Sequence, residues 1–506
     1  MLILTYKKMS CPDVIKLIKS MSKVEKRKFK MSTKKQSGDK DYLVLFDLID
    51  QTDVIESPSA IKDKYNKARP GSSIDNTATY LLKMLTDSLI ESKTKEDSAF
   101  RLFHGMLRMQ VLQERSLYEE GFKELKKLQQ VAITSQNHLM EYFISRQELN
   151  YAAELNFKDL TEKDLIQKQM KAREILKSLL NTQEHYSLNE ILKYRLNYSG
   201  KISSEENKKR LNDLVLNEMS LVTGRNKDNY ESQKLHLLFQ SFFFTDIGDY
   251  KSALKTFYEL NKLFEQNKDL WSNPPADYFS SLEGILDSLR AIKRYEEMPF
   301  YIEKISGIDL PVYPEFFRLQ LRRTINIYQI NILIATSKFV EAAAFIKNIA
   351  PSLLKANNIS NDEKQIELLF YCGLAYYQLK NFKKANQYLN EIILVGKISF
   401  QSIAYKVSRL LGLLIYYEDN NIEYLQYAMR SYRRSPGNKE KLLKTETLIF
   451  KTLTFHPDKN NYVKNEMMWN KLLPLISAIE KDKYEMQLGK YFDFTGWIKT
   501  KFKARH

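Results

Sequence analysis

The chain has 506 residues, a formal net charge of +17 and 43% hydrophobic residues. This length suits two to four domains or one long repeat array, and the apolar fraction can supply a sizeable core. Only 15 glycines and 12 prolines occur, which argues against a turn-rich sheet fold and favours long helices.

The basic charge has two interpretations. One is a polyanionic partner, either a nucleic acid or an anionic membrane surface. The other is compositional bias, because Lys, Asn, Ile and Tyr are abundant together. Lys greatly outnumbers Arg, and Arg is the better residue for recognising phosphates, so we favour the second interpretation.

The two cysteines, Cys11 and Cys372, cannot form a disulfide framework, which favours a reducing intracellular compartment. A short apolar run, MLILTY, precedes Lys7 and Lys8, which is the reverse of the order in a secretory signal. No stretch approaches the ~20 apolar residues of a membrane span. We therefore expect a cytoplasmic protein without membrane contact, in which residues 1–9 are disordered or precede a true start at Met9.

In the N-terminal part, apolar residues recur at the three- and four-residue spacing typical of helices. We expect residues 10–93 to form a basic N-terminal module of about five short helices. Ser22 and Glu25 have the spacing of a capping box, and Ser57-Pro58 suits an N-cap followed by a first-turn proline. The segment ARPGSS, residues 68–73, predicts a break.

From residue 94 to residue 490 the predicted helices lengthen and pair. Breaks are expected at several polar stretches, among them NTQEHYS at residues 181–187. No low-complexity linker divides this region, which favours one continuous stack. Residues 491–506 are expected to be a basic, frayed end, although Trp497 and Phe502 are suited to capping the last helix pair.

The segment GLAYYQLKNFKKANQYL, residues 373–389, resembles the tetratricopeptide repeat, a pair of antiparallel helices with small residues at their crossing. Gly373 stands at the small position of the first helix, Asn381 at the turn, and Ala385 at the small position of the second helix. Helix axes about 8 Å apart leave no room for a large side chain at the crossing.

Weaker copies of this pattern place residues 253, 298, 342, 385 and 425 at equivalent positions, with differences of 45, 44, 43 and 40 residues. One copy also carries Gly412. The family period is about 34 residues, so the helices here are expected to be longer. The close match covers one unit and the loose matches cover about residues 235–435.

The resemblance implies an all-α fold: a right-handed α–α superhelix of tetratricopeptide-like hairpins over residues 94–490, with the small N-terminal helical module before it. A generic helical bundle or another helical array is the alternative. The whole chain also resembles uncharacterised bacterial helical-repeat proteins that carry a segment like LIKSMSKVEKRKFK, and this likeness implies no activity.

The motifs of common enzyme classes are missing from the sequence. The six histidines have no i, i+4 partner, and GxxxxGK[ST], GxGxxG and GxSxG do not occur. We therefore expect no catalytic, metal or cofactor-binding residues and no enzymatic activity, with an unrecognised active site as the weakest alternative.

One candidate surface is basic. Residues 16–35 hold nine Lys or Arg residues against the single acid Glu25. Four of them would share one helix face and could contact a polyanion: Lys23, Lys26, Arg27 and Lys30. The module could also be helix-turn-helix-like. A solvated face in a lysine-rich protein is the alternative that we favour.

The other candidate surface follows from the resemblance, because the first helix of each tetratricopeptide unit lines a concave groove. The implied groove residues are Asp287, Arg290, Asn331, Phe370, Leu374, Tyr377, Gln378, Lys406 and Arg409. Ordinary packing against the next helix is the alternative for each. Our first functional hypothesis is a non-enzymatic scaffold that binds peptide or helical segments of a protein partner in this groove. The second is a nucleic-acid-associated regulator that uses the basic module.

Overall fold

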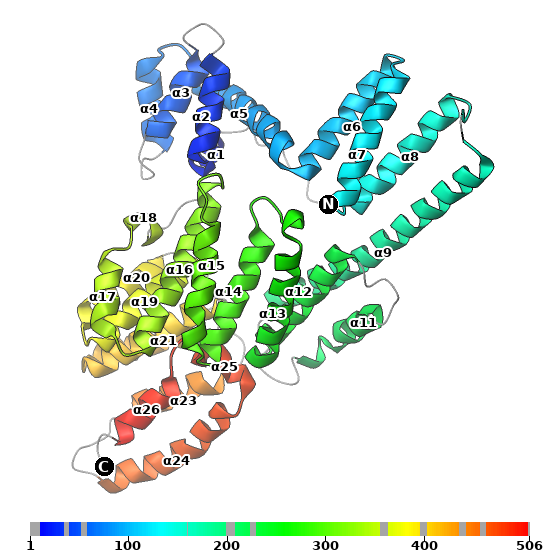
Figure 1. The fold of residues 1–506 in the computed structure, drawn as a ribbon. Coiled ribbons are helices and arrows are strands. Elements are labelled where there is room, and N and C mark those ends of the chain that lie inside the picture. The colour runs from blue at the N-terminus through cyan, green and yellow to red at the C-terminus, as the bar shows by residue number, and fades with distance from the viewer. Residues whose placement is uncertain are drawn as a thin grey trace.

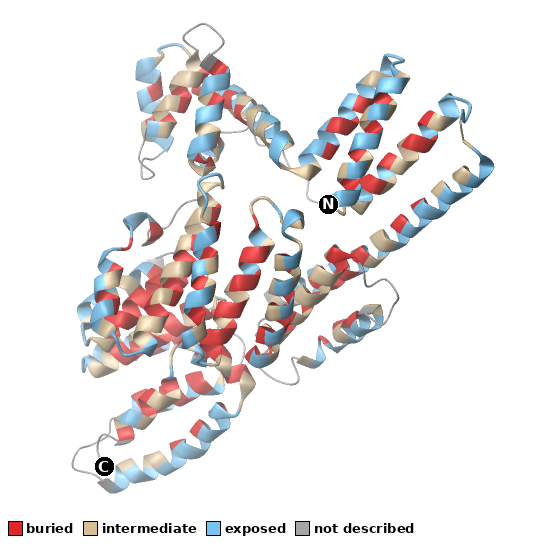
Figure 2. Cartoon of the chain, viewed as in Figure 1, coloured by how far each residue is buried: buried red, intermediate tan, exposed pale blue. Residues whose placement is uncertain are grey.

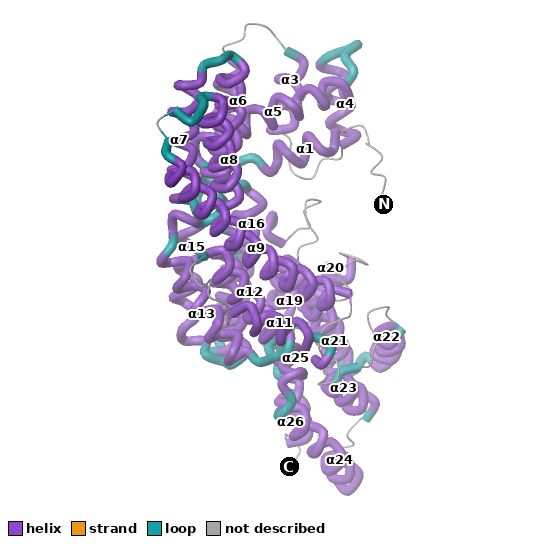
Figure 3. Tube along the Cα trace, turned by 90° about the vertical axis from the view of Figure 1, so that its right-hand side faces the viewer, coloured by secondary structure: helices purple, strands orange, loops and turns teal. Residues whose placement is uncertain are grey.

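The computed structural model describes residues 11–34, 40–51, 58–158, 160–198, 208–222, 229–354, 363–394, 402–434, 442–455 and 462–503. Throughout these ranges the regular elements are helices, and none of them contains a strand (Figure 3). The prediction of an all-α fold is confirmed. No helix in the described ranges has the length and apolarity needed to cross a bilayer.

Five helices at the N-terminal end pack around an apolar core of their own (Figure 1). They are α1 (Cys11–Ser20), α2 (Lys23–Lys34), α3 (Asp41–Gln51), α4 (Pro58–Ala68) and α5 (Ile74–Glu96). The capping box before α2 is confirmed. The Glu25 amide donates to Ser22 Oγ at 3.2 Å, and the Ser22 amide donates to Glu25 Oε2 at 2.7 Å. Pro58 opens α4 as predicted, whereas Ser57 lies outside the described residues.

The next helices are α6 (Ser98–Glu114), α7 (Tyr118–Thr134), α8 (His138–Glu154), α9 (Glu162–Tyr198) and α11 (Asn212–Val222). The predicted break at residues 181–187 is wrong, because α9 runs through it without interruption. The stretch contains neither Gly nor Pro, and three of its polar side chains, those of Asn181, Thr182 and Tyr186, form hydrogen bonds to α12 (Tyr230–Asp246). Thr182 Oγ1 lies 3.0 Å from Ser232 Oγ across this helix contact. Polarity here therefore reflects hydrogen bonding between helices rather than a loop.

Five antiparallel hairpins follow and contribute most of the largest apolar core, as the buried positions in Figure 2 show. Their first helices are α12, α14 (Ala276–Ala291), α16 (Glu315–Ala335), α19 (Glu363–Gln378) and α21 (Ile403–Glu418). Their second helices are α13 (Tyr250–Gln266), α15 (Met298–Ile308), α17 (Phe339–Lys347), α20 (Phe382–Leu394) and α22 (Ile422–Arg433). Short elements lie between them: η1 (Lys268–Leu270), η2 (Tyr295–Glu297) and α18 (Pro351–Leu354).

The same turn closes each of these hairpins. One residue has a left-handed backbone: Gly248, Lys293, Ser337, Lys380 or Asn420. The next amide bonds back to a carbonyl five residues earlier, as from Asp249 to Phe244 and from Asn381 to Tyr376, both at 2.9 Å. This bond is that of a Schellman helix terminus. The turns are spaced by 45, 44, 43 and 40 residues, so the predicted repeat spacing is confirmed.

Of the two glycines that prompted the repeat prediction, Gly373 lies at a helix crossing and Gly412 does not. A Cβ on Gly373 would stand 3.1 Å from Leu389 Cδ2 and 3.4 Å from the Ala385 carbonyl, so α19 and α20 approach closely there. The prediction is wrong for Gly412, because a Cβ there would meet nothing within 4 Å. The sequence interpretation missed Gly284 in α14, where a Cβ would lie 2.2 Å from the Phe257 ring.

The C-terminal helices turn back toward the middle of the array (Figure 1). They are α23 (Lys444–Thr454), α24 (Tyr462–Glu480), η5 (Lys483–Glu485), α25 (Met486–Gly489) and α26 (Phe494–Lys503). Trp497, Ile498 and Phe502 on α26 are buried. The expected frayed end is therefore wrong for residues 494–503, because aromatic packing orders them.

Candidate functional site

The last described stretch of the chain, residues 483–503, crosses the carboxyl ends of four first helices, and we call it the C-terminal strap. It touches α12, α14, α19 and α21 in turn. Its polar contacts with these helices include Gln487 Nε2 to the Asp246 carbonyl (2.9 Å), Lys490 Nζ to Asp287 Oδ2 (2.8 Å) and Trp497 Nε1 to Glu418 Oε1 (2.8 Å). The strap also contacts α23, where the Lys444 and Thr445 amides donate to the Glu485 carboxylate. Its ring contacts join Tyr491 to Phe370 at 5.8 Å and Phe492 to Tyr377 at 6.1 Å between centroids.

The strap begins against the α12–α13 turn. Gly248 there has φ +76°, and a Cβ on it would stand 2.0 Å from the Lys483 carbonyl oxygen. The neighbouring Tyr484 is buried in an apolar cluster with Phe239 and Ile247. Glycine at this turn thus permits both the left-handed backbone and the close approach of the strap.

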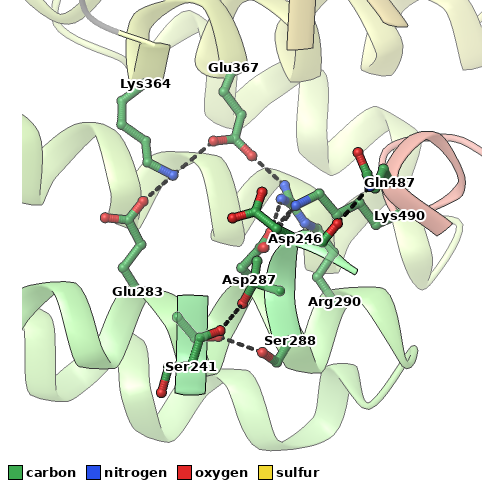
Figure 4. Close-up of polar contacts among 12 residues, drawn as sticks. Ser241, Asp246, Glu283, Asp287, Ser288, Arg290, Lys364, Glu367, Gln487 and Lys490 are labelled. Atoms are coloured by element: carbon green, nitrogen blue, oxygen red, sulfur yellow. Dashed lines mark hydrogen bonds and ion pairs between the residues drawn. The ribbon is translucent and has the colours of Figure 1, made fainter. Parts of the chain in front are cut away.

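A network of charged side chains lies beneath the strap (Figure 4). Glu283, Asp287 and Arg290 are spaced so that they share one face of α14. On α19, Glu367 Oε1 lies 2.5 Å from Arg290 Nη1, and Glu367 Oε2 lies 2.9 Å from Lys364 Nζ. Lys364 also pairs with Glu283, and Arg290 with Asp287. The strap completes the network through Lys490, which pairs with Asp287.

Arg290 is the centre of this network, and its side chain is only 1% exposed. Its guanidinium lies 4.7 Å from the ring centroid of Tyr491 and 5.3 Å from that of Tyr328, and it donates to Tyr371 Oη at 2.8 Å. Cation–π contacts and ion pairs of this kind compensate in part for removing the charge from water.

The carboxylates of the network respond differently to burial. Burial opposes ionisation of Glu367, but the charges of Lys364 and Arg290 outweigh it and lower the pKa to about 2. The pKa of Asp287 is lowered as well, since Lys490 and Arg290 overcome the effect of burial. For Glu283 burial prevails over Lys364, and its pKa is raised. The network therefore keeps Asp287 as an ionised partner for the strap lysine.

Several buried polar atoms beside the network have no hydrogen-bond partner in the described structure. Three come from one face of α16, at i, i+4 and i+7: Thr324 Oγ1, Tyr328 Oη and Asn331 Oδ1. The fourth is Arg290 Nε on α14. Buried polar groups are normally hydrogen-bonded, so four unpaired atoms on two neighbouring first helices, α14 and α16, are an unusual concentration.

The predicted groove residues divide into three groups. Asp287, Arg290, Phe370 and Tyr377 lie together at the strap or in the network beneath it. Asn331 and Leu374 are buried within the array, and Gln378 and Lys406 are half-buried. Arg409 points elsewhere, since its guanidinium packs on Tyr432 at 5.0 Å and donates to Ser431 Oγ at 3.2 Å on α22.

Sequence reasoning did not single out several residues that take part in this site: Lys364, Glu367, Tyr371, Glu418, Lys490 and Tyr491. One feature of the sequence pointed to the strap. Five large aromatic residues stand among the last sixteen, a density that suits a packed end rather than a frayed one.

The predicted polyanion surface on α2 is partly used within the protein. Lys26 Nζ lies 3.0 Å from Asp50 Oδ1, and Lys30 Nζ lies 2.8 Å from Asp47 Oδ1 on α3. Lys23 and Arg27 are exposed. Two of the four predicted cations are thus balanced by neighbouring acids, which weakens the field that this surface presents.

Two histidines far apart in the sequence meet between α9 and α12. The rings of His185 and His236 are 6.4 Å apart, and His236 Nδ1 contacts the buried carboxylate of Glu218 on α11. Burial lowers the pKa of His185, with His236 adding to the effect. Across the described ranges, no group of three or more His, Cys, Asp or Glu side chains has the arrangement of a metal site.

Comparison with known proteins assigns no family. No protein-family model matches the chain, and no curated protein is detectably similar to it. Any functional conclusion therefore rests on the residues and contacts described above.

Acid is expected to destabilise the protein through Glu418, which joins the strap to α21. Burial opposes its charge, but hydrogen bonds from Lys380, Trp497, Tyr377 and Lys501 lower its pKa from 4.5 to about 2. A folded-state pKa below the unfolded value gives stability that is present above about pH 4.5 and is lost as the pH falls toward 2.

Thermal denaturation of the wild type and of Glu418→Gln between about pH 7 and pH 3 measures this effect. The variant should have the lower Tm at neutral pH and the shallower loss of Tm below pH ~4.5. Glu283 acts with the opposite sign, because its raised pKa favours the folded state in acid. Parallel Tm curves for the two proteins would exclude Glu418 as a source of the acid sensitivity.

Proposed function

We propose that this protein is a non-enzymatic scaffold that binds a peptide or helical segment of a partner protein along the inner face of its hairpin array. The observation that carries the proposal is the C-terminal strap. A segment of about twenty residues already lies across four of the five first helices, α12, α14, α19 and α21, and one of its side chains contacts each of them. A surface that holds one such segment has the shape and the chemistry for segment recognition.

The arrangement of the hairpins supports a tetratricopeptide-like superhelix as the framework. Small or apolar residues at the marker positions of the second helices are all buried: Ala253, Met298, Ala342, Ala385 and Leu425. Repeats of this kind bury their faces only against neighbours, so stacking yields a continuous core and one long surface. In tetratricopeptide arrays the first helices line the inner side of that surface.

A second surface in the N-terminal half supports a scaffold role. Four apolar residues form one stripe on α6, and Phe103 and Leu107 within it are 60% and 64% exposed. Phe100 and Val111 extend the stripe at helical spacing. Contiguous exposed apolar surface is typical of sites that another protein covers.

Site-specific photo-crosslinking in the cells of origin tests the proposal on the full-length chain. A photoreactive amino acid replaces Gln378 or Lys406, which lie half-buried on first helices, or Lys251 or Glu341, which are exposed on second helices. The proposal expects crosslinks to a foreign protein from the first pair and not from the second. Equal crosslinking from both pairs, or none from the first, would refute it.

The nucleic-acid alternative has less support, since only Lys23 and Arg27 of the predicted basic face are exposed. The same experiment addresses it when the photoreactive residue stands at Lys23. Recovery of nucleic acid there, without protein crosslinks at Gln378, would favour the alternative over the scaffold.

A further inference from the structure

The contacts of the strap define the chemistry that the inner face selects. Two carboxylates of the array bind polar groups of the strap. Asp287 pairs with Lys490, and Glu418 accepts a hydrogen bond from the Trp497 indole and pairs with Lys501. Between them lie aromatic side chains of α19. Tyr491 packs on Phe370 and Tyr371, and Phe492 packs on Tyr377.

These anchors are built into the array rather than formed by chance on its surface. The side chains of Asp287 and Glu418 are only 18% and 7% exposed. Arg290 orients Asp287, while Tyr377 Oη and Lys380 Nζ lie 2.5 Å and 2.6 Å from the Glu418 carboxylate. Desolvated acids of this kind favour a cation or an N–H donor arriving at one defined point.

Recognition of the strap depends mainly on side chains. Its anchoring residues are Lys490, Tyr491, Phe492 and Trp497, and they fall within eight positions of the sequence KYFDFTGW. Phe494 is buried in the same stretch. Another chain that carries these residues at this spacing would present the same groups to Asp287, the α19 aromatics and Glu418.

We propose that the inner face recognises partner segments in which a lysine is followed by two aromatic residues and, at the seventh position after the lysine, by tryptophan. The strap is the chain's own copy of this ligand, and a partner segment replaces it. This inference rests on the proposed scaffold function and names the chemical class of its partner.

Because the strap occupies this surface, a partner segment must compete with it for the same contacts. A tethered ligand acts at an effective concentration of about millimolar, so a free segment of equal affinity competes poorly. Weakening one strap anchor should therefore raise the apparent affinity for a free segment. A partner must therefore bind more tightly than the strap does.

The test uses the full-length chain and a fluorescein-labelled synthetic peptide of residues 483–503, with binding followed by fluorescence polarisation. Lys490→Glu places a carboxylate against Asp287 and should release the strap. We expect this variant to bind the peptide at least about tenfold more tightly than the wild type. Lys499→Glu is the matched control, because Lys499 pairs with Glu480 on α24 and not with the array. A peptide carrying both Lys490→Glu and Trp497→Ala should not bind.

Equal peptide affinity in the wild type and in folded Lys490→Glu would overturn the inference. If Lys490→Glu does not fold, hydrogen exchange of the wild-type protein tests the same inference. Strap amides should exchange faster than those of α19, in a local opening, and equally slow exchange would show a permanent structural element. Persistent crosslinks at Gln378 together with absent peptide binding would leave the scaffold function standing and refute only this partner class.

Discussion

Replacing Arg290 by alanine is expected to lower the free energy of unfolding by about 3–5 kcal/mol. The Arg290 guanidinium pairs with Glu367 Oε1 at 2.5 Å, and it also pairs with Asp287. Its removal leaves the Glu367 and Asp287 carboxylates with less positive charge nearby and takes a cation from the faces of Tyr491 and Tyr328. Urea denaturation of the full-length chain, followed by circular dichroism, measures the change.

Arg409→Ala is the matched control for this substitution. Arg409 also lies near an aromatic ring, but it is half-buried and has a single hydrogen bond to Ser431 at 3.2 Å. Its loss should cost less than about 1 kcal/mol. Adding Glu367→Gln to Arg290→Ala should recover part of the loss, because it removes one unpaired charge. Equal destabilisation by the two arginine substitutions would contradict the central role of Arg290.

The hairpins could be predicted because their determinants are local. Each turn, each small residue at a crossing and each helical periodicity lies within about 45 residues of sequence, as for Gly373 and Ala385. The same reasoning failed at residues 181–187. Thr182 resembles a loop residue until its partner Ser232 on α12, fifty residues further along the chain, is known. Polar residues at helix interfaces are thus indistinguishable from loop residues in a single sequence.

The candidate site was predictable only in part, for a related reason. Asp287, Arg290, Phe370 and Tyr377 follow from the face of the first helix in each hairpin. Their partner on the strap does not, because Lys490 stands 203 residues after Asp287. No periodicity within either segment encodes that contact. Only the aromatic density near the C-terminus hinted that the end of the chain is packed.

The same substitution, glycine to alanine, is expected to have opposite effects at Gly284 and Gly412. Both residues lie inside first helices, α14 and α21, where alanine is favoured over glycine by about 0.5–1 kcal/mol. At Gly412 a Cβ meets nothing within 4 Å, so Gly412→Ala should stabilise the protein by about that amount.

At Gly284 the added Cβ would lie 2.2–2.6 Å from three ring atoms of Phe257, a rigid side chain that is itself buried. The ring or the α13–α14 spacing must shift, and overpacking of this kind costs about 1–3 kcal/mol. Gly284→Ala should therefore destabilise the protein by about 1–2 kcal/mol after the gain in helix propensity. Unfolding midpoints in urea for the two variants measure both effects. A stabilising Gly284→Ala would mean that α13 and α14 do not cross closely, and it would contradict the close stacking of these two neighbouring hairpins.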